Sequence, residues 1–142
     1  MPTLTGALNA SASALDAQRT RIEVATSNIA NAESTRGADG LPYRRRDVVL
    51  AATGMDSFDA VFGRADGIGV EVVDIIKDRT PFRQRYEPAH PDADAQGFVS
   101  MPNVDVPEEM VDMVGAARAY QANLAAITII RETVQRALEL GK

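Results

Sequence analysis

The chain has 142 residues, of which 45% are hydrophobic and 25% charged, a composition typical of a folded protein. Its net charge of -5 gives no overall basic footprint for nucleic acid, and the absence of cysteine excludes disulfides and thiolate metal ligands. Aromatic residues make up only 5% and tryptophan is absent, so the core must be mostly aliphatic, which suits long helices better than a globular shape.

A long helix is predicted from Leu4 to about Ala32, because this stretch is rich in alanine and has no proline or glycine after Gly6. Apolar side chains recur every seven residues, as coiled coils require, at Leu8, Leu15, Ile22 and Ile29. The accompanying row is small or polar, which predicts close but weak packing. We therefore expect this helix to depend on a partner for its stability.

The middle of the chain, residues 33–104, changes character because glycine and proline interrupt any long helix. Short runs with strand composition occur at 43–51, 68–76, 82–86 and 98–101. This part is predicted to be a small, mostly β insertion with loops.

A second helix is predicted to begin after Asp105, which has the features of an N-cap, with Pro107 in the first turn and Glu108 three residues after the cap. Another sevenfold row follows at Met113, Tyr120, Ile127 and Val134, flanked by Ala117, Leu124 and Leu138, and Gly141 ends the pattern. Asn123 lies on the inner side of this row, where a polar residue can fix helix register.

The predicted fold class is mainly α with a small β insertion. Residues 1–32 and 105–142 are predicted to form one helical domain, in which the heptad helices pair as an elongated coiled-coil-like layer, and residues 33–104 are inserted between them. No apolar run is long enough to span a bilayer, and no Lys or Arg precedes Arg19, which argues against a secretory signal peptide of the usual kind.

The stretch from His90 to Asp94, with Glu87 nearby, is the best candidate for a metal or acid–base site, since one histidine and several carboxylates could bind a divalent ion. A single histidine without a second His or Cys is a sparse ligand set, so a proline-fixed turn in which aspartates bond their own backbone is favoured. For Arg44 to Arg46 we favour a solvated or ion-paired strand edge over a phosphate site. Asn28 and Asn31 are interpreted as residues that terminate the first helix.

Several motifs resemble known proteins in a consistent order. The stretch Ser27 to Asn31 (SNIAN) resembles the N-terminal signature of the flagellar axial proteins, the rod and hook family. Later stretches are similar to proximal rod members of that family and together cover nearly the whole chain: 41–46, 86–94, 102–104, 109–110 and 117–123. One departure is Ala89, where the family is expected to have glycine.

The resemblance implies a non-enzymatic structural subunit of the proximal rod, polymerising around the export channel, with no cofactor and no small-molecule substrate. It implies other rod proteins, the basal-body adaptor FliE and the flagellar type III export apparatus as partners, and export to the periplasm without a cleaved signal. Alternatives are an exported metal-dependent hydrolase that uses His90 and nearby carboxylates, or a coiled-coil adaptor that stays in the cytoplasm. The side chains expected at helix and subunit interfaces are Leu8, Leu15, Ile22, Asn28, Ile29, Asn31, Met113, Ala117, Tyr120, Asn123, Leu124, Ile127 and Val134.

Overall fold

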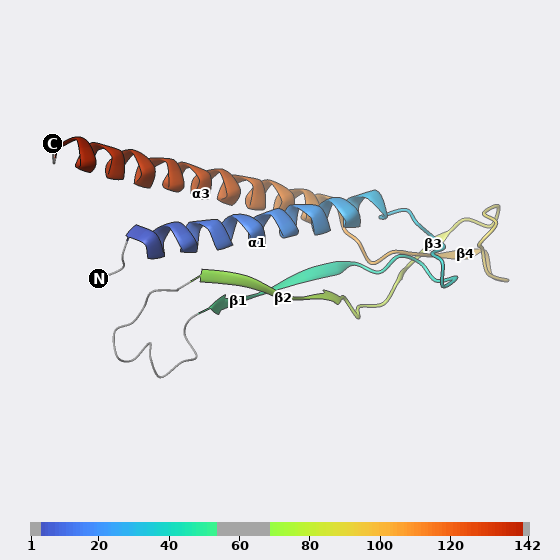
Figure 1. Cartoon of the computed structure of the whole chain (residues 1–142). Coiled ribbons are helices and arrows are strands. Elements are labelled where there is room, and N and C mark those ends of the chain that lie inside the picture. The colour runs from blue at the N-terminus through green and yellow to red at the C-terminus, as the bar shows by residue number, and fades with distance from the viewer. Residues whose placement is uncertain (1–3, 54–68, 141–142) are drawn as a thin grey trace. The chain divides into compact units, whose positions relative to one another are not determined.

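The computed structural model describes residues 4–53 and 69–140 (Figure 1). Its elements in chain order are α1 (Leu4–Ala30), β1 (Arg46–Thr53), β2 (Gly69–Lys77), β3 (Arg83–Tyr86), β4 (Phe98–Met101) and α3 (Val106–Leu140). The predicted class, mainly α with a small β insertion, is confirmed, and each predicted strand overlaps an observed one. The predicted end of the last helix at Gly141 falls outside the described residues.

The helix ends follow from local hydrogen bonds. Asp105 caps α3, because its Oδ1 accepts a bond of 3.3 Å from Glu108 N, as the sequence predicts. At the end of α1, Asn31 N donates to the carbonyls of Ser27 and Asn28 at 3.1 and 3.2 Å, and the Asn31 side chain donates to the Ser27 carbonyl at 2.8 Å. Asn31 therefore terminates the helix as expected, whereas Asn28 lies within the helix and has another role.

The strands form two separate pairs, β1 with β2 and β3 with β4. In the second pair the strands are antiparallel, with Arg83 opposite Met101 and Tyr86 opposite Phe98. Gly97 closes this hairpin at a φ of 84°, and a Cβ there would lie 3.0 Å from the Tyr86 ring. A side chain at this position would thus be strained both by its backbone angle and by its neighbours.

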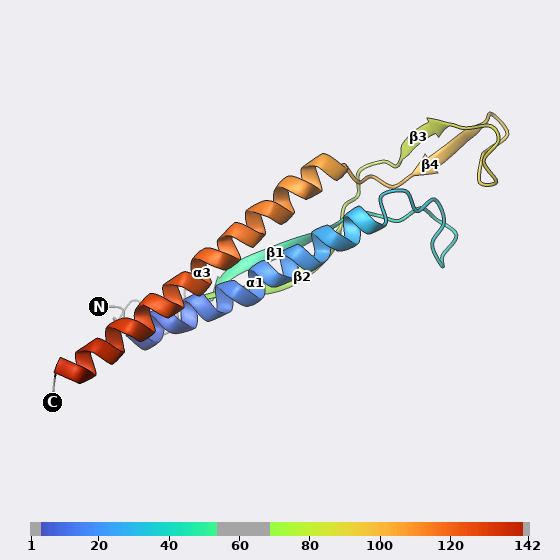
Figure 2. The ribbon, with the colours of Figure 1, turned by 90° about the horizontal axis from the view of Figure 1, so that it is seen from above.

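The chain divides into two compact units, each built from parts of both terminal helices and of the middle. The first unit comprises residues 1–20, 49–74 and 115–142. Within it, both ribbon views place the strand pair along α1 (Figures 1 and 2). Ser13 of α1 accepts a hydrogen bond of 3.1 Å from Val70 N of β2. A Cβ at Gly69 would lie 2.8 Å from Ser13 Oγ, so glycine is needed for this close approach.

The second unit comprises residues 21–48 and 75–114. Its buried apolar residues are few and mostly of modest size: Ala25, Ala32, Val99, Met101, Pro102 and Val104. Two polar side chains, Asn28 and Glu109, are buried with them. Burial of polar groups in so small a core is costly unless each is hydrogen-bonded, which makes these two residues the natural starting point for the site.

Candidate functional site: a buried polar junction and the helix stripes

Asn28 of α1 is fully buried and uses its whole amide. Its Nδ2 donates to the Arg46 carbonyl at 2.8 Å and to Glu109 Oε2 at 2.9 Å. Its Oδ1 accepts from Arg46 N at 3.0 Å and from the Tyr43 hydroxyl at 2.9 Å. One side chain thus connects α1, the start of β1 and the first turns of α3 within the second unit.

Arg45 neutralises the buried carboxylate. Its Nε donates to Glu109 Oε1, and its Nη1 lies 3.7 Å from Asp78 Oδ2. The Arg45 main chain is fixed as well, since its N donates to Asn103 Oδ1 at 2.9 Å. Burial alone would lower the pKa of Arg45, but the hydrogen bond and negative charge of Glu109 raise the pKa. We call Asn28, Tyr43, Arg45, Asp78 and Glu109 the polar junction.

The junction is fully satisfied: in the described ranges no buried side-chain nitrogen or oxygen lacks a hydrogen-bond partner. A buried charge pair of this kind adds little net stability compared with an apolar pair, but removing one partner costs about 3–5 kcal/mol. The junction therefore specifies one arrangement of the three segments within the unit.

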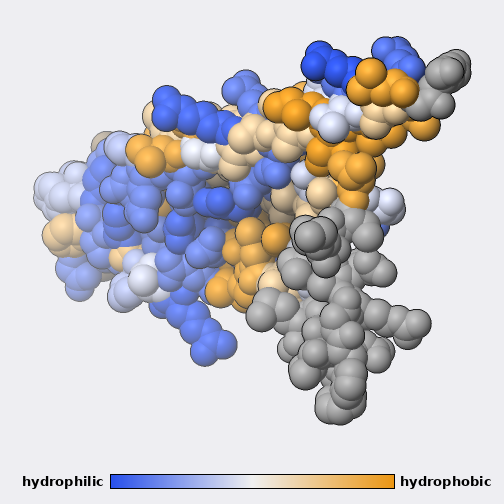
Figure 3. Space-filling model, turned by 90° about the vertical axis from the view of Figure 1, so that its left-hand side faces the viewer, coloured by the Kyte–Doolittle hydropathy of each residue, from blue (hydrophilic) through white to orange (hydrophobic). Residues whose placement is uncertain are grey.

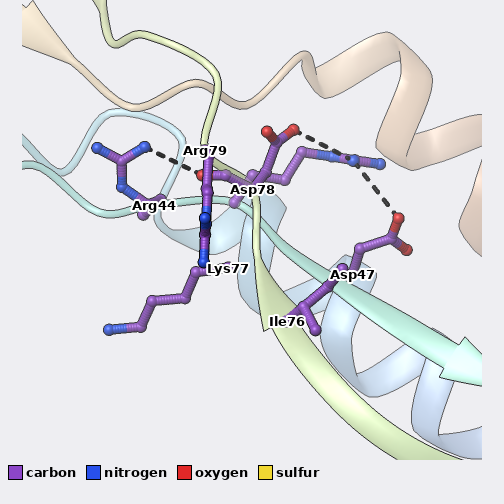
Figure 4. Close-up of a pocket in the computed structure, with 7 residues that line it drawn as sticks. Arg44, Asp47, Ile76, Lys77, Asp78 and Arg79 are labelled. Carbon is purple, nitrogen blue, oxygen red and sulfur yellow. Dashed lines mark hydrogen bonds and ion pairs between the residues drawn. The ribbon is translucent and has the colours of Figure 1, made fainter.

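Asp78 connects the junction to an open pocket at the ends of β1 and β2. The pKa of Asp78 is lowered, first by the hydrogen bond of 2.8 Å that its carboxylate accepts from Thr80 N, and also by the charges of Arg45 and Arg44. Arg44 Nη1 donates to the Asp78 carbonyl (Figure 4) and to the Thr80 carbonyl. Its guanidinium lies 4.2 Å from the centre of the Phe82 ring. Of the arginine run, Arg45 is thus ion-paired and Arg44 is anchored by carbonyls and an aromatic ring.

The sevenfold rows are partly covered in the single chain. Among the expected interface residues Asn28 is fully buried. Most of the others are half-buried: Leu8, Leu15, Ile22, Ile29, Asn31, Met113, Ala117, Tyr120, Asn123, Ile127 and Val134. Leu124 is 50% exposed. In the second unit the two helices touch directly, since Thr26 Oγ1 lies 3.8 Å from Met113 Sδ and Arg21 pairs with Asp112 at 3.9 Å.

Helix α3 carries large apolar residues that the single chain leaves exposed: Met110, Val111, Val114, Leu124, Ile129, Leu138 and Leu140. Scattered exposed apolar residues are common, but a series along one helix is typical of a surface that binds other proteins. Among the described residues, no helix is long and apolar enough to cross a membrane.

The stretch around His90 forms a turn. Asp94 Oδ1 accepts from the main-chain N of Gln96 and of Phe98, both at 2.9 Å, as predicted for a self-bonded turn. Asp92 instead accepts from Thr35 Oγ1 at 2.9 Å, and His90 Nδ1 accepts from Asp92 N at 3.1 Å. The described part of the chain holds no cluster of three or more potential metal ligands.

The turn also tolerates alanine at position 89, where the family is expected to have glycine. No residue other than glycine has a positive φ in the described ranges, so the backbone at Ala89 is unstrained without a glycine.

Sequence reasoning did not find the junction. The sequence pattern predicts a helix-terminating and interface role for Asn28, and it predicts no buried role for Glu109 or Arg45. A signal was nevertheless present, because Glu109 falls four residues before Met113 on the apolar side of the helix, and a carboxylate there needs a buried partner.

Two known protein families match the chain, one towards each end. Residues 6–38 match the family "Flagella basal body rod protein", and residues 95–140 match "Flagellar basal body rod FlgEFG protein C-terminal". These matches lie on α1 and α3 and define the chain as one of the flagellar basal-body rod proteins.

Relatives that match the chain over nearly their whole length show to which family of rod proteins it belongs. The chain is 45% identical to the flagellar basal-body rod protein FlgC of Salmonella typhimurium over 92% of each chain. It is 43% identical to FlgC of Bacillus subtilis over 95% of this chain and 96% of the relative, and 39% identical to FlgC of Aquifex aeolicus over 96% of each. The chain therefore belongs to the FlgC family. It is a structural subunit of the flagellar basal body rod and not an enzyme, and nothing supports the hydrolase alternative.

Proposed function

We propose that this rod subunit belongs to the proximal rod and polymerises with other rod proteins around the export channel. The observation that carries the proposal is the exposed apolar series on α3, from Met110 to Leu140, which the single chain does not cover. A rod subunit surrounded by neighbours would bury this surface, and the gain is about 25 cal/mol for each Å² of apolar area removed from water.

In this proposal residues 1–32 and 105–142 form the inner helical layer, and residues 33–104 face outward. The half-buried rows that include Leu15 and Ile127 pack within the subunit and against its neighbours. The exposed polar residues Gln121, Thr128 and Gln135 face the channel, where a wet wall would not trap unfolded cargo.

The proposed partners are other rod proteins, the basal-body adaptor FliE, and the flagellar type III export apparatus. The proposed location is the periplasmic rod, reached without cleavage of a signal peptide. Support comes from the relatives, which are rod proteins by name.

The experiment is to locate the chain in purified basal bodies. A short epitope inserted after Gly40 suits this purpose, because Gly40 lies in an exposed turn and a Cβ there meets no atom within 4 Å. We expect electron micrographs to show the epitope at the membrane-proximal end of the rod. Mass spectrometry should find the tagged chain at the full mass of its sequence. Absence of the chain from basal bodies, in cells that make it and swim normally, would refute the proposal.

A further inference from the structure

The pocket at the ends of β1 and β2 carries a surplus of positive charge. It has a volume of about 730 Å³ and is lined by Arg44, Arg45, Asp47, Ile76, Lys77, Asp78 and Arg79 (Figure 4). Four cations face two carboxylates there, in a chain whose net charge is -5. A volume of this size can hold several side chains.

The surplus resides on two of the cations. Both carboxylates already pair with Arg45, at 3.9 Å from Asp47 and 3.7 Å from Asp78. The side chains of Lys77 and Arg79 are exposed and make no ion pair or hydrogen bond with any residue in the described ranges. Ile76, which also lines the pocket, is 46% exposed. The pocket thus suits a ligand that is both negative and apolar.

The last turn of α3 has the complementary character. A helix C-terminus carries partial negative charge from its free carbonyls and is normally stabilised by cations, yet the last turn of α3 contains no basic residue. It contains Glu139, whose carboxylate has no partner among the described residues. Leu138 and Leu140 on either side are 68% and 90% exposed. Figure 3, which views the molecule from the end where α3 finishes, shows orange hydrophobic surface along the upper part of this face.

We propose that the last turn of α3 in one copy of this chain docks in the pocket of a second copy. Glu139 and the free carbonyls face Lys77 and Arg79, and the leucines cover Ile76. The two surfaces belong to different parts of the chain, so each copy can offer its helix end to the next copy and its pocket to the one before. In this proposal the contact is heterologous and repeats from copy to copy without closing as a dimer. This inference rests on the proposed function, because it requires several copies in one assembly.

The absence of cysteine allows a direct test by disulfide trapping. The full chain carrying both Ile76→Cys and Leu140→Cys keeps Lys77, Arg79 and Glu139 intact, and both changed side chains are exposed. Basal bodies purified from cells that express only this variant are oxidised, and the chain is separated on a non-reducing gel. We expect a ladder of dimers and higher multimers, because every copy carries both halves of the contact.

The matched control replaces Leu140→Cys with Thr133→Cys, two turns earlier and about 10 Å along the helix, which is beyond the reach of a disulfide. It should give at most a trace of multimers. Adding Lys77→Gln and Arg79→Gln to the original pair should lower the multimer fraction about fivefold, the effect expected for two exposed ion pairs.

The possible results separate the two proposals. Basal bodies that contain the variant but give no multimers, or give as many with the Thr133→Cys control, would refute the docking contact and leave the rod assignment intact. A disulfide confined to single chains would also refute it, because the two surfaces would then meet within one copy. Absence of the wild-type chain from basal bodies would instead refute the proposed function.

Discussion

Replacement of Asn28 by alanine tests the polar junction most directly. The change removes four hydrogen bonds of 2.8–3.0 Å, which join Asn28 to Arg46, Glu109 and Tyr43. A typical intramolecular hydrogen bond contributes about 1 kcal/mol net, and a partner left buried without a bond costs more. We therefore expect Asn28→Ala to lower the free energy of unfolding by about 4 kcal/mol, a large share of the roughly 5–15 kcal/mol typical of a domain.

Asn31→Ala is the matched control, three residues further along the same segment. The Asn31 side chain makes one local bond, to the Ser27 carbonyl at 2.8 Å, so its removal should cost about 1 kcal/mol or less. Both free energies are measured by urea unfolding of the purified chains, followed by circular dichroism at 222 nm. Equal losses for the two variants would refute the reasoning, because the junction would then contribute no more than a helix end.

A second variant, Asn28→Asp, keeps the shape and changes the chemistry. The two acceptor bonds from Arg46 N and Tyr43 survive, but a carboxylate oxygen now replaces the donor 2.9 Å from Glu109 Oε2. Two carboxylates this close cannot both ionise without cost, so the pair should share a proton and one pKa should rise. This variant should regain stability relative to the wild type as pH falls from 7 towards 4, whereas the stability gap of Asn28→Ala should show no such recovery.

Three further predictions concern other parts of the molecule. Arg45→Met leaves the Glu109 carboxylate buried without its cation and should cost about 3–5 kcal/mol in urea unfolding, most of which Glu109→Leu in the same chain should restore. Asp78 has a folded pKa below its ordinary value of 3.8, so the stability that it contributes is present above that value and is lost as pH falls through the folded pKa. Asp78→Asn should therefore make the free energy of unfolding less dependent on pH in acid. An unchanged acid dependence would contradict the assignment. Leu15→Asp or Ile127→Asp would place an unpaired charge in the helix rows at a cost of several kcal/mol, and cells carrying either change should lack rods and motility on soft agar. Normal rods in both strains would mean that the rows do not mediate assembly.

Much of the fold could be predicted because it rests on local signals. The cap at Asp105 and the end of the first helix at Asn31 use bonds between residues within four positions of each other. The strands Arg83–Tyr86 and Phe98–Met101 follow from short strand runs flanked by turn residues. Such features depend little on the rest of the chain.

The junction could not be predicted because its partners are distant in sequence. An asparagine near a helix end usually bonds its own backbone, and nothing local distinguishes Asn28 from Asn31, although one reaches Glu109 and the other Ser27. Side-chain size is also a poor guide to burial within the single chain. The single chain buries Ala116 and leaves Leu124 half exposed, since small residues are favoured where segments approach closely and the hydrophobic pattern does not record that distance.

The distance in sequence between the junction residues also determines when the polar junction can form as the chain emerges. Asn28 and Glu109 are 81 positions apart, and Arg45 must arrive between them. A chain that emerges from a ribosome or a narrow conduit in N-to-C order presents α1 and the hairpins long before the carboxylate that they need. The entropic cost of closing a loop of this length is only slightly greater than that of a shorter loop. The delay in forming the junction therefore comes from the order in which its residues appear. The junction therefore cannot close until the last quarter of the chain has begun to emerge.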